Sequence, residues 1–128
     1  MDEKLRRHGS VSWSELLTSD VPAAKKFYGD LFGWEFDDMP MDDGTYSVVS
    51  VNDDEVAGIM AFPPDAPPMP PSWGLYITVD DVDAMAEKAA GMGAKICMPP
   101  KDIPHVGRFC VLQDPQGAFI SIITYVSF

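Results

Sequence analysis

The feature that most constrains the fold of this chain is an internal repeat. When the sequence is shifted by 60 positions, identical residues superpose at five points that mark a strand start, a helix cap and a helix end. The matched pairs are Trp13 and Trp73, Thr18 and Thr78, Asp20 and Asp80, Ala24 and Ala84, and Gly33 and Gly93. The repeat predicts two copies of one structural unit.

The first copy begins with a predicted strand over residues 11–17 and a helix that follows it. Asp20 is expected to cap the helix, Pro22 needs no backbone N–H in the first turn, and Gly33 is a typical stop. We expect the helix to pack on the sheet through a stripe of apolar residues at i, i+4 spacing. That stripe consists of Ala23, Ala24, Phe27, Tyr28 and Leu31.

Three further strands complete the first copy, and a proline-rich segment follows it. The strands are expected over residues 34–38, 46–51 and 55–62, with turn signals between them. The first copy is therefore a β-α-β-β-β unit over residues 11–62. The stretch 63–72 contains six prolines and is predicted to be a stiff linker, with a PxxP-type recognition role as the alternative.

The second copy, residues 73–128, repeats this plan. A strand over 73–79 precedes a helix over 82–92 that Asp80 or Asp81 caps, and its buried stripe is expected to contain Val82, Met85, Ala86 and Ala89. A strand over 95–98 and a loop lead into a hairpin with a Pro/Gly turn at 114–117. Ser121 is a polar residue in the middle of the last strand, where the sheet would meet a ligand. The predicted fold class is α+β, with one module used twice.

Composition indicates one compact domain of 128 residues and 14.0 kDa, preceded by a flexible polar tail over residues 1–10. A net charge of −11 argues against a nucleic-acid partner, because binding phosphates requires a cluster of basic residues. No apolar stretch approaches the ~18 residues of a membrane span, so we expect a cytoplasmic protein. Cys97 and Cys110 lack metal-site spacing and are expected to be buried, reduced thiols.

Three stretches of the sequence together resemble the vicinal oxygen chelate superfamily. They are WSELLTSDVPAAKKFYGDLFGW, YITVDDVDAMAEKAAGMGAKI and VGRFCVLQDPQGAFISI, and the resemblance extends over residues 11–125. The superfamily includes glyoxalase I, bleomycin-resistance proteins, fosfomycin-resistance proteins and extradiol dioxygenases, and the chain is most similar to a glyoxalase-related subgroup of unassigned activity. The resemblance implies two β-α-β-β-β modules that form a curved sheet around a cavity, in a homodimer.

The resemblance also implies where a divalent metal would be held in a metalloenzyme of this superfamily. Those ligand positions correspond to Trp13, Gly74, Ser121 and residues 58–60. Such a site needs several N, O or S donors, and these residues do not supply them. We therefore expect no metal and no cofactor, and the metal-dependent reactions of the superfamily are not expected.

Candidate site residues follow from strand alternation and from the resemblance. Trp13 would either stack against a flat ligand or fill the space of the missing metal. Glu15 lies among apolar neighbours, so it would act as a general base or bind a ligand amine, unless the strand end is wet and the carboxylate solvated. The predicted ligand-binding residues are Trp13, Met60, Phe109, Val111, Ser121 and Ile123, and the catalytic candidates are Glu15, Tyr76 and His105. Tyr46 and the nearby aspartates are interpreted as turn residues on a solvated rim.

Three functional hypotheses follow. In the first, the chain binds a small apolar or aromatic metabolite without a metal. In the second, it is a metal-independent lyase or isomerase that uses Glu15, with Tyr76 or His105, for proton transfer. In the third, it is a structural dimer module whose cavity is filled by its own side chains. The sequence leaves open whether the protein is an enzyme.

Overall fold

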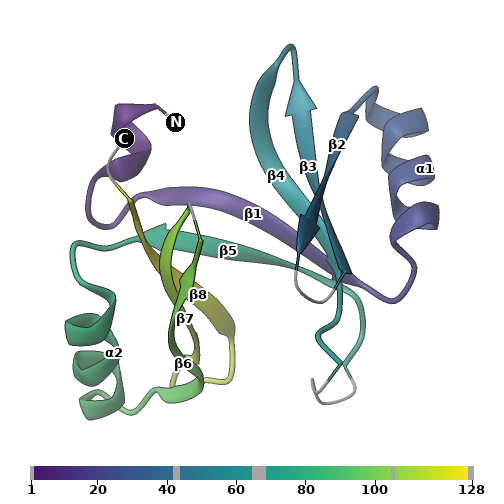
Figure 1. The fold of residues 1–128 in the computed structure, drawn as a ribbon. Coiled ribbons are helices and arrows are strands. Elements are labelled where there is room, and N and C mark those ends of the chain that lie inside the picture. Colours follow the sequence, from purple (N-terminus) through teal and green to yellow (C-terminus); the bar gives the residue numbers. More distant parts are fainter. Residues whose placement is uncertain (1, 42–43, 65–68, 105, 127–128) are drawn as a thin grey trace. The chain divides into compact units, whose positions relative to one another are not determined.

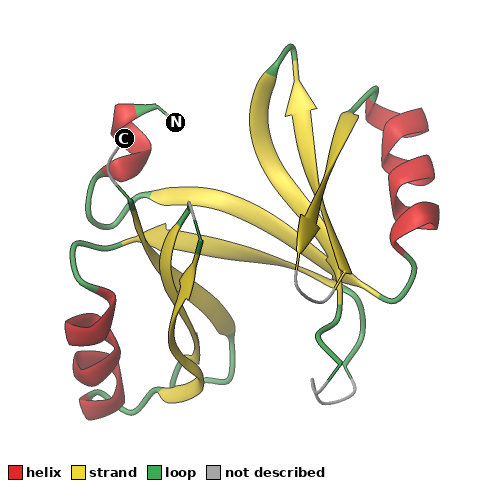
Figure 2. Cartoon of the chain, viewed as in Figure 1, coloured by secondary structure: helices red, strands yellow, loops and turns green. Residues whose placement is uncertain are grey.

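The computed structural model describes residues 2–41, 44–64, 69–104 and 106–126. The chain divides into two compact units. The first unit is Trp13–Gly74, and the second unit combines Met1–Ser12 with Leu75–Phe128. Figure 1 labels the helices and strands, and Figure 2 distinguishes helix, strand and loop. Among the described residues, no helix is long and apolar enough to cross a membrane.

The first unit contains one helix and four strands in the predicted order β-α-β-β-β. They are β1 (Val11–Thr18), α1 (Val21–Phe32), β2 (Glu35–Met41), β3 (Gly44–Val51) and β4 (Asp54–Ala61). The strand order is β2-β3-β4-β1. The β2–β3 and β3–β4 pairs are antiparallel, whereas β4 and β1 are parallel. A parallel pair needs a long connection, and α1, β2 and β3 provide it.

The second unit repeats the plan. Its elements are β5 (Ser72–Thr78), α2 (Val82–Gly91), β6 (Lys95–Ile103), β7 (Gly107–Gln113) and β8 (Phe119–Tyr125). The start of β5, up to Gly74, belongs to the first unit. The order β5-β8-β7-β6 mirrors the first unit, with β5 and β8 parallel and the other pairs antiparallel. The predicted α+β fold built from one module used twice is confirmed.

Local capping signals set the helix ends. The Asp20 side chain accepts a hydrogen bond from the backbone N–H of Ala23, and α1 ends at Gly33, whose φ of 74° suits glycine. The second helix is capped by Asp81, which accepts from the backbone N–H of Ala84. Of the two aspartates that the sequence left open, Asp81 is therefore the cap.

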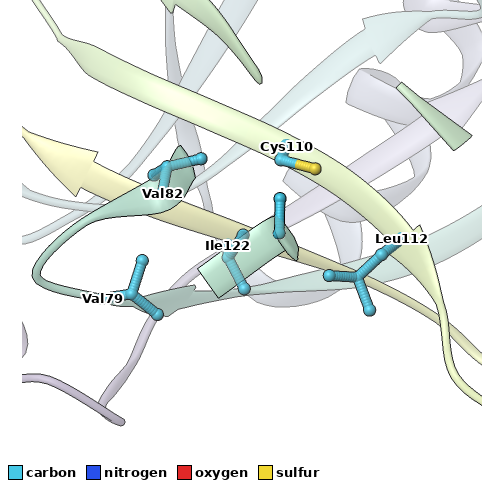
Figure 3. Close-up of a cluster of buried hydrophobic side chains, with 6 residues drawn as sticks. Val79, Val82, Cys110, Leu112 and Ile122 are labelled. Carbon is cyan, nitrogen blue, oxygen red and sulfur yellow. The ribbon is translucent and has the colours of Figure 1, made fainter. Parts of the chain in front are cut away.

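Each helix covers one face of its own four-stranded sheet. Under α2, the buried residues are Val79, Val82, Ala86, Cys110, Leu112 and Ile122, most of them labelled in Figure 3. Met85 and Ala89 pack against this cluster, so the predicted stripe of α2 is confirmed. Under α1, the buried residues are Leu16, Val49, Ala57 and Ile59.

The predicted stripe of α1 is wrong in part. Phe27 and Leu31 are 57% and 58% exposed. The residues of α1 that pack on the sheet are Val21, Ala24 and Tyr28. They form a row at i, i+3, i+7 spacing, so the adjacent row that includes Phe27 and Leu31 points away from the sheet.

Two further sequence expectations need correction on β6. This strand continues through Pro99 and Pro100 to Ile103, where the sequence predicted a loop after residue 98. A proline is tolerated there because β6 is an edge strand with irregular register against β7. Cys97 on β6 is exposed rather than buried, whereas Cys110 is buried as expected.

The N-terminal segment expected as a flexible tail forms hydrogen bonds with β5. Residues Glu3–Arg6 form a short 3-10 helix. The backbone N–H of Gly9 donates to Thr78 O at 2.7 Å, and the backbone N–H of Thr78 donates to Ser10 O at 2.8 Å. This segment therefore belongs to the second unit.

Candidate functional site

In each unit, the face of the sheet opposite the helix is called here the helix-free face. In the first unit, strand pairing places Glu15, Gly58 and Val48 side by side on it. Leu17 pairs with Met60 on the same face. Leu16 and Ile59 lie on the other face, in the core under α1, because side chains alternate along a strand.

A chain of hydrogen bonds connects three side chains on the helix-free face of the first unit. The indole Nε1 of Trp13 donates to the hydroxyl oxygen of Tyr46 at 2.9 Å. The Tyr46 hydroxyl in turn donates to Glu15 Oε1 at 2.9 Å. All three side chains are half-buried. The structure thus brings the predicted residues Trp13 and Glu15 together, and Tyr46 links them.

Gly58 makes room for Tyr46. A Cβ atom at position 58 would overlap the Tyr46 ring and hydroxyl. The glycine therefore lets the phenol lie against β4 and reach both Trp13 and Glu15. The result is an aromatic surface next to an oriented carboxylate, which suits a flat molecule that carries a hydrogen-bond donor.

Sequence reasoning missed Tyr46 and assigned it to a solvated rim. Alternation along β3 separates Tyr46 and Val48 from Ser47 and Val49, but it does not say which pair faces the helix. The pairing of Ser47 with Ile59 settles the question, because Ile59 belongs to the core under α1. Gly58 on β4, which pairs with Val48, was the one available sign of a large side chain nearby.

The second unit gathers the other predicted residues on its own helix-free face. Tyr76, Ser121 and Val111 are neighbours across β5, β8 and β7, and Phe109 pairs with Ile123. The rings of Tyr76 and Phe109 have centroids 6.4 Å apart. Tyr76 and Ile123 are buried, and the others are half-buried. This face is mostly apolar, and His105 lies outside the described residues.

Tyr125 lies on β8, the strand that also contains Ser121 and Ile123. Its hydroxyl and the Ser12 Oγ are 2.8 Å apart, within hydrogen-bond distance. Burial raises the pKa of Tyr125, and the hydrogen bond with Ser12 opposes that effect. The phenol is therefore held protonated at neutral pH.

The residues at the implied metal-ligand positions do not fit a metal ion. The indole nitrogen of Trp13 already donates its hydrogen to Tyr46, and it offers no free lone pair. Gly74 has no side chain, and Ser121 supplies one neutral hydroxyl. Among the residues that the structure describes, no three His, Cys, Asp or Glu side chains are grouped so that they could hold a metal.

Comparisons with known proteins agree with this fold. The chain is 45% identical over 119 residues to the "Putative glyoxylase CFP32" of Mycobacterium tuberculosis, which covers 91% of this chain and 46% of that protein. It is 30% identical over 128 residues to the "Anthracycline biosynthesis protein DnrV" of Streptomyces peucetius, covering 89% of this chain and 46% of that protein. The chain thus spans about half the length of these curated relatives.

A solved structure with the same fold is methylmalonyl-CoA epimerase from Mycobacterium tuberculosis. The TM-score is 0.65 at 18% identity, and the match covers 91% of this chain and 90% of the epimerase. Residues 10–122 match the family profile of the Glyoxalase/Bleomycin resistance protein/Dioxygenase superfamily. Fold, sequence relatives and profile agree, and the chain belongs to the glyoxalase/bleomycin resistance protein/dioxygenase superfamily.

Proposed function

We propose that this chain binds a small apolar or aromatic molecule on the helix-free face of its first unit, without a metal. The observation that supports this proposal is the hydrogen-bond chain from Trp13 through Tyr46 to Glu15. An indole fixed by its own N–H is a preorganised stacking surface, so less side-chain freedom is lost when a ligand binds. The adjacent Glu15 carboxylate would accept a hydrogen bond from a hydroxyl or amine of the ligand.

The other residues that the sequence singled out are proposed as ligand contacts, each on the helix-free face of its own unit. On the first unit this is Met60, which lies on the same face as Glu15. On the helix-free face of the second unit the proposed residues are Phe109, Val111, Ser121 and Ile123. Aliphatic and aromatic walls with few polar groups are typical of small-molecule sites.

The test is a ligand-observed NMR screen of aromatic fragments against the purified chain, followed by titration of the hits into variants. Trp13→Leu should weaken binding about tenfold, because the lost contact area adds to the roughly 1 kcal/mol of an aromatic contact. Trp73→Leu is the matched control, because Trp73 instead packs against Tyr28 and Trp34. If no fragment binds, the result favours a structural module whose cavity is filled by its own side chains. If Trp13→Leu binds as well as the wild type, the ligand does not contact Trp13 and the proposed site is wrong.

A second candidate function is proton transfer with Glu15 as the general base. The contact that favours it is the 2.9 Å hydrogen bond from Tyr46, which orients the carboxylate. Tyr76 and His105 remain proposed partners for such a reaction. Deuterium uptake from D₂O into the C–H bonds of a bound fragment separates the two functions. A pure binder gives none, whereas an enzyme gives uptake that Glu15→Gln abolishes while affinity is retained.

We also propose a cytoplasmic homodimer with no metal cofactor. Metal analysis of the purified protein should then find no stoichiometric zinc, nickel or iron, and any of these at one per chain would contradict the metal-independent part. Sedimentation velocity at micromolar concentration should give the mass of a dimer. A monomer would contradict that part alone and leave the ligand proposal standing.

A further inference from the structure

The first unit also contains a cavity at the C-terminal end of α1, where β2 begins and β3 ends. Its volume is about 440 Å³, within the usual range for small-molecule sites. The helix supplies its last residue, Phe32, and the beginning of β2 and the end of β3 supply most of the rest. The lining residues are Phe32, Gly33, Trp34, Glu35, Ser50, Val51 and Asn52.

Aromatic rings form one wall of this cavity. The rings of Phe32 and Trp34 have centroids 5.2 Å apart and are tilted by 40°. Tyr28 stacks on both rings, and Trp73 meets Trp34 edge-on. The neighbouring rings hold this wall in place, although Phe32 itself is 59% exposed. Ring faces of this kind attract cations through their negative electrostatic potential.

Three sources of negative potential add to the ring faces. Glu35, one of the lining residues, is an exposed and negatively charged side chain. The C-terminal end of a helix carries partial negative charge, and the last turn of α1 contains no basic residue to offset it. None of the described lining residues is Lys, Arg or His, and the whole chain has a net charge of −11. The cavity therefore favours a cation over an anion.

We propose that this cavity is a binding site for a small organic cation in which an ammonium group adjoins an aromatic ring. The ring of the ligand would contact Phe32 and Trp34, and its ammonium group would lie near Glu35 and the end of α1. The site is separate from the hydrogen-bond chain of the proposed function, because none of Trp13, Tyr46 and Glu15 is among its lining residues. The inference therefore stands or falls independently of the proposed function.

The test is an NMR titration of the ¹⁵N-labelled full chain with three probes of similar shape. Benzyltrimethylammonium should shift the Trp34 indole N–H and the amides of Glu35, Ser50 and Asn52. Benzyl alcohol should bind at least severalfold more weakly, and benzenesulfonate should cause no shift at these positions. The proposal is overturned if benzenesulfonate binds as well as the cation, or if the cation shifts only residues elsewhere.

Variants at the exposed rim test the site without disturbing the core. Glu35→Gln should weaken binding of benzyltrimethylammonium about two- to fivefold, the range of an exposed charge pair. Val51→Lys should abolish it, because a cation would then occupy the rim of the cavity. The matched controls are Glu87→Gln and Phe119→Ala, both exposed residues of the second unit, and they should bind as the wild type does. Equal affinity of Glu35→Gln and the wild type would contradict the proposal.

A second copy of the chain is the competing occupant of this surface. Cross-saturation between labelled and unlabelled chains would show Phe32 and Trp34 at a protein interface if a copy covered the cavity. That result would overturn the ligand proposal. Absence of cross-saturation at these residues, together with cation-selective shifts, supports it.

Discussion

The two helices pack against the strands of their own units through different kinds of side chain. The second unit uses small residues, and α2 buries Val82 and Ala86 against its sheet. In the first unit, none of the twelve residues of α1 is fully buried, and the half-buried Tyr28 contacts a group of aromatic rings instead. Small aliphatic residues form a closed core, whereas bulky rings leave part of their surface exposed.

The helix-free faces differ as well. The first unit carries a polar connection between aromatic residues, from Trp13 through Tyr46 to Glu15. The second unit presents aliphatic and aromatic side chains around one serine. The repeated plan therefore fixes the positions of strands and helices but not their chemistry. Both the hydrogen-bond chain from Trp13 to Glu15 and the cation cavity belong to the unit that is richer in aromatic residues.

The largest expected loss of stability comes from replacing a buried glycine in each unit with alanine. At Gly107, a Cβ atom would overlap the carbonyl oxygen of Thr124 and crowd the backbone of Tyr125. At Gly58, the three atoms nearest to the added atom all belong to the side chain of Tyr46. We expect Gly107→Ala to reduce the free energy of unfolding by about 3 kcal/mol or more, and Gly58→Ala by about 1 to 2 kcal/mol, because a side chain moves more easily than a paired strand.

Urea denaturation measures both losses. Gly91→Ala is the control, because its Cβ would meet no atom within 4 Å and alanine favours a helix. A double variant tests the mechanism in the first unit, since Gly58→Ala should cost little once Tyr46→Ala has removed the ring. Equal losses for Gly58→Ala and Gly107→Ala would mean that the two sheets tolerate crowding alike.

The next largest loss of stability tests the difference in burial between the two helices. Val82 on α2 is 2% exposed, whereas Leu31 on α1 is 58% exposed. Val82→Ala should cost about 2 kcal/mol in the free energy of unfolding, and Leu31→Ala less than about 0.5 kcal/mol. The measurement is again urea denaturation, at two protein concentrations. A large, concentration-dependent loss for Leu31→Ala would show that the exposed row of α1 is covered by a second copy.

Local signals explain why much of the fold is predictable from the sequence. Asp20 and Gly33 act on neighbouring backbone groups, so the ends of α1 follow from residues next to them. The stripe of α2 is also local, because its residues repeat with the helical period. The exposure of Phe27 could not be predicted in this way, because two adjacent rows of α1 are apolar and only packing decides which one meets the sheet.

The candidate site was predictable only in part, for a similar reason. Alternation along a single strand places Trp13 and Glu15 on one face, so this pair is predictable from neighbouring residues alone. Tyr46 joins them through pairing between β3 and β4, which depends on residues far apart in the chain. The strand through Pro99 and Pro100 depends likewise on its place at the edge of the sheet.

The smallest expected loss of stability comes from removing an exposed ion pair in each unit. In the second unit, Arg108 binds both carboxylate oxygens of Asp83, at 2.9 and 3.0 Å, and so connects β7 to α2. In the first unit, Lys25 and Ser47 donate to Asp38. These hydrogen bonds lower the pKa of Asp83 and the pKa of Asp38 below the ordinary value for a carboxyl group.

The sign of the pH dependence follows from those lowered pKa values. The folded chain holds the proton of Asp83 less tightly than the unfolded chain does, so the ion pair stabilises the fold above the ordinary carboxyl pKa. That contribution is lost as the pH falls through the lowered pKa. Asp83→Asn and Asp38→Asn should therefore lower the urea midpoint at about pH 7, and their difference from the wild type should shrink toward about pH 2.5.

Both losses should be modest, because exposed ion pairs contribute little to stability. Asp83→Asn should have the larger one, since the planar guanidinium of Arg108 binds the two carboxylate oxygens through two nitrogens, whereas Lys25 reaches both oxygens of Asp38 from a single nitrogen. Glu87→Gln, which removes an exposed carboxylate of α2 outside this pair, is the control and should not change the pH dependence. If Asp38→Asn lowers the urea midpoint more than Asp83→Asn does, the hydrogen bonds of Asp38 with Lys25 and Ser47 stabilise the fold more than those of Asp83 with Arg108. The first unit would then have the stronger connection between helix and sheet.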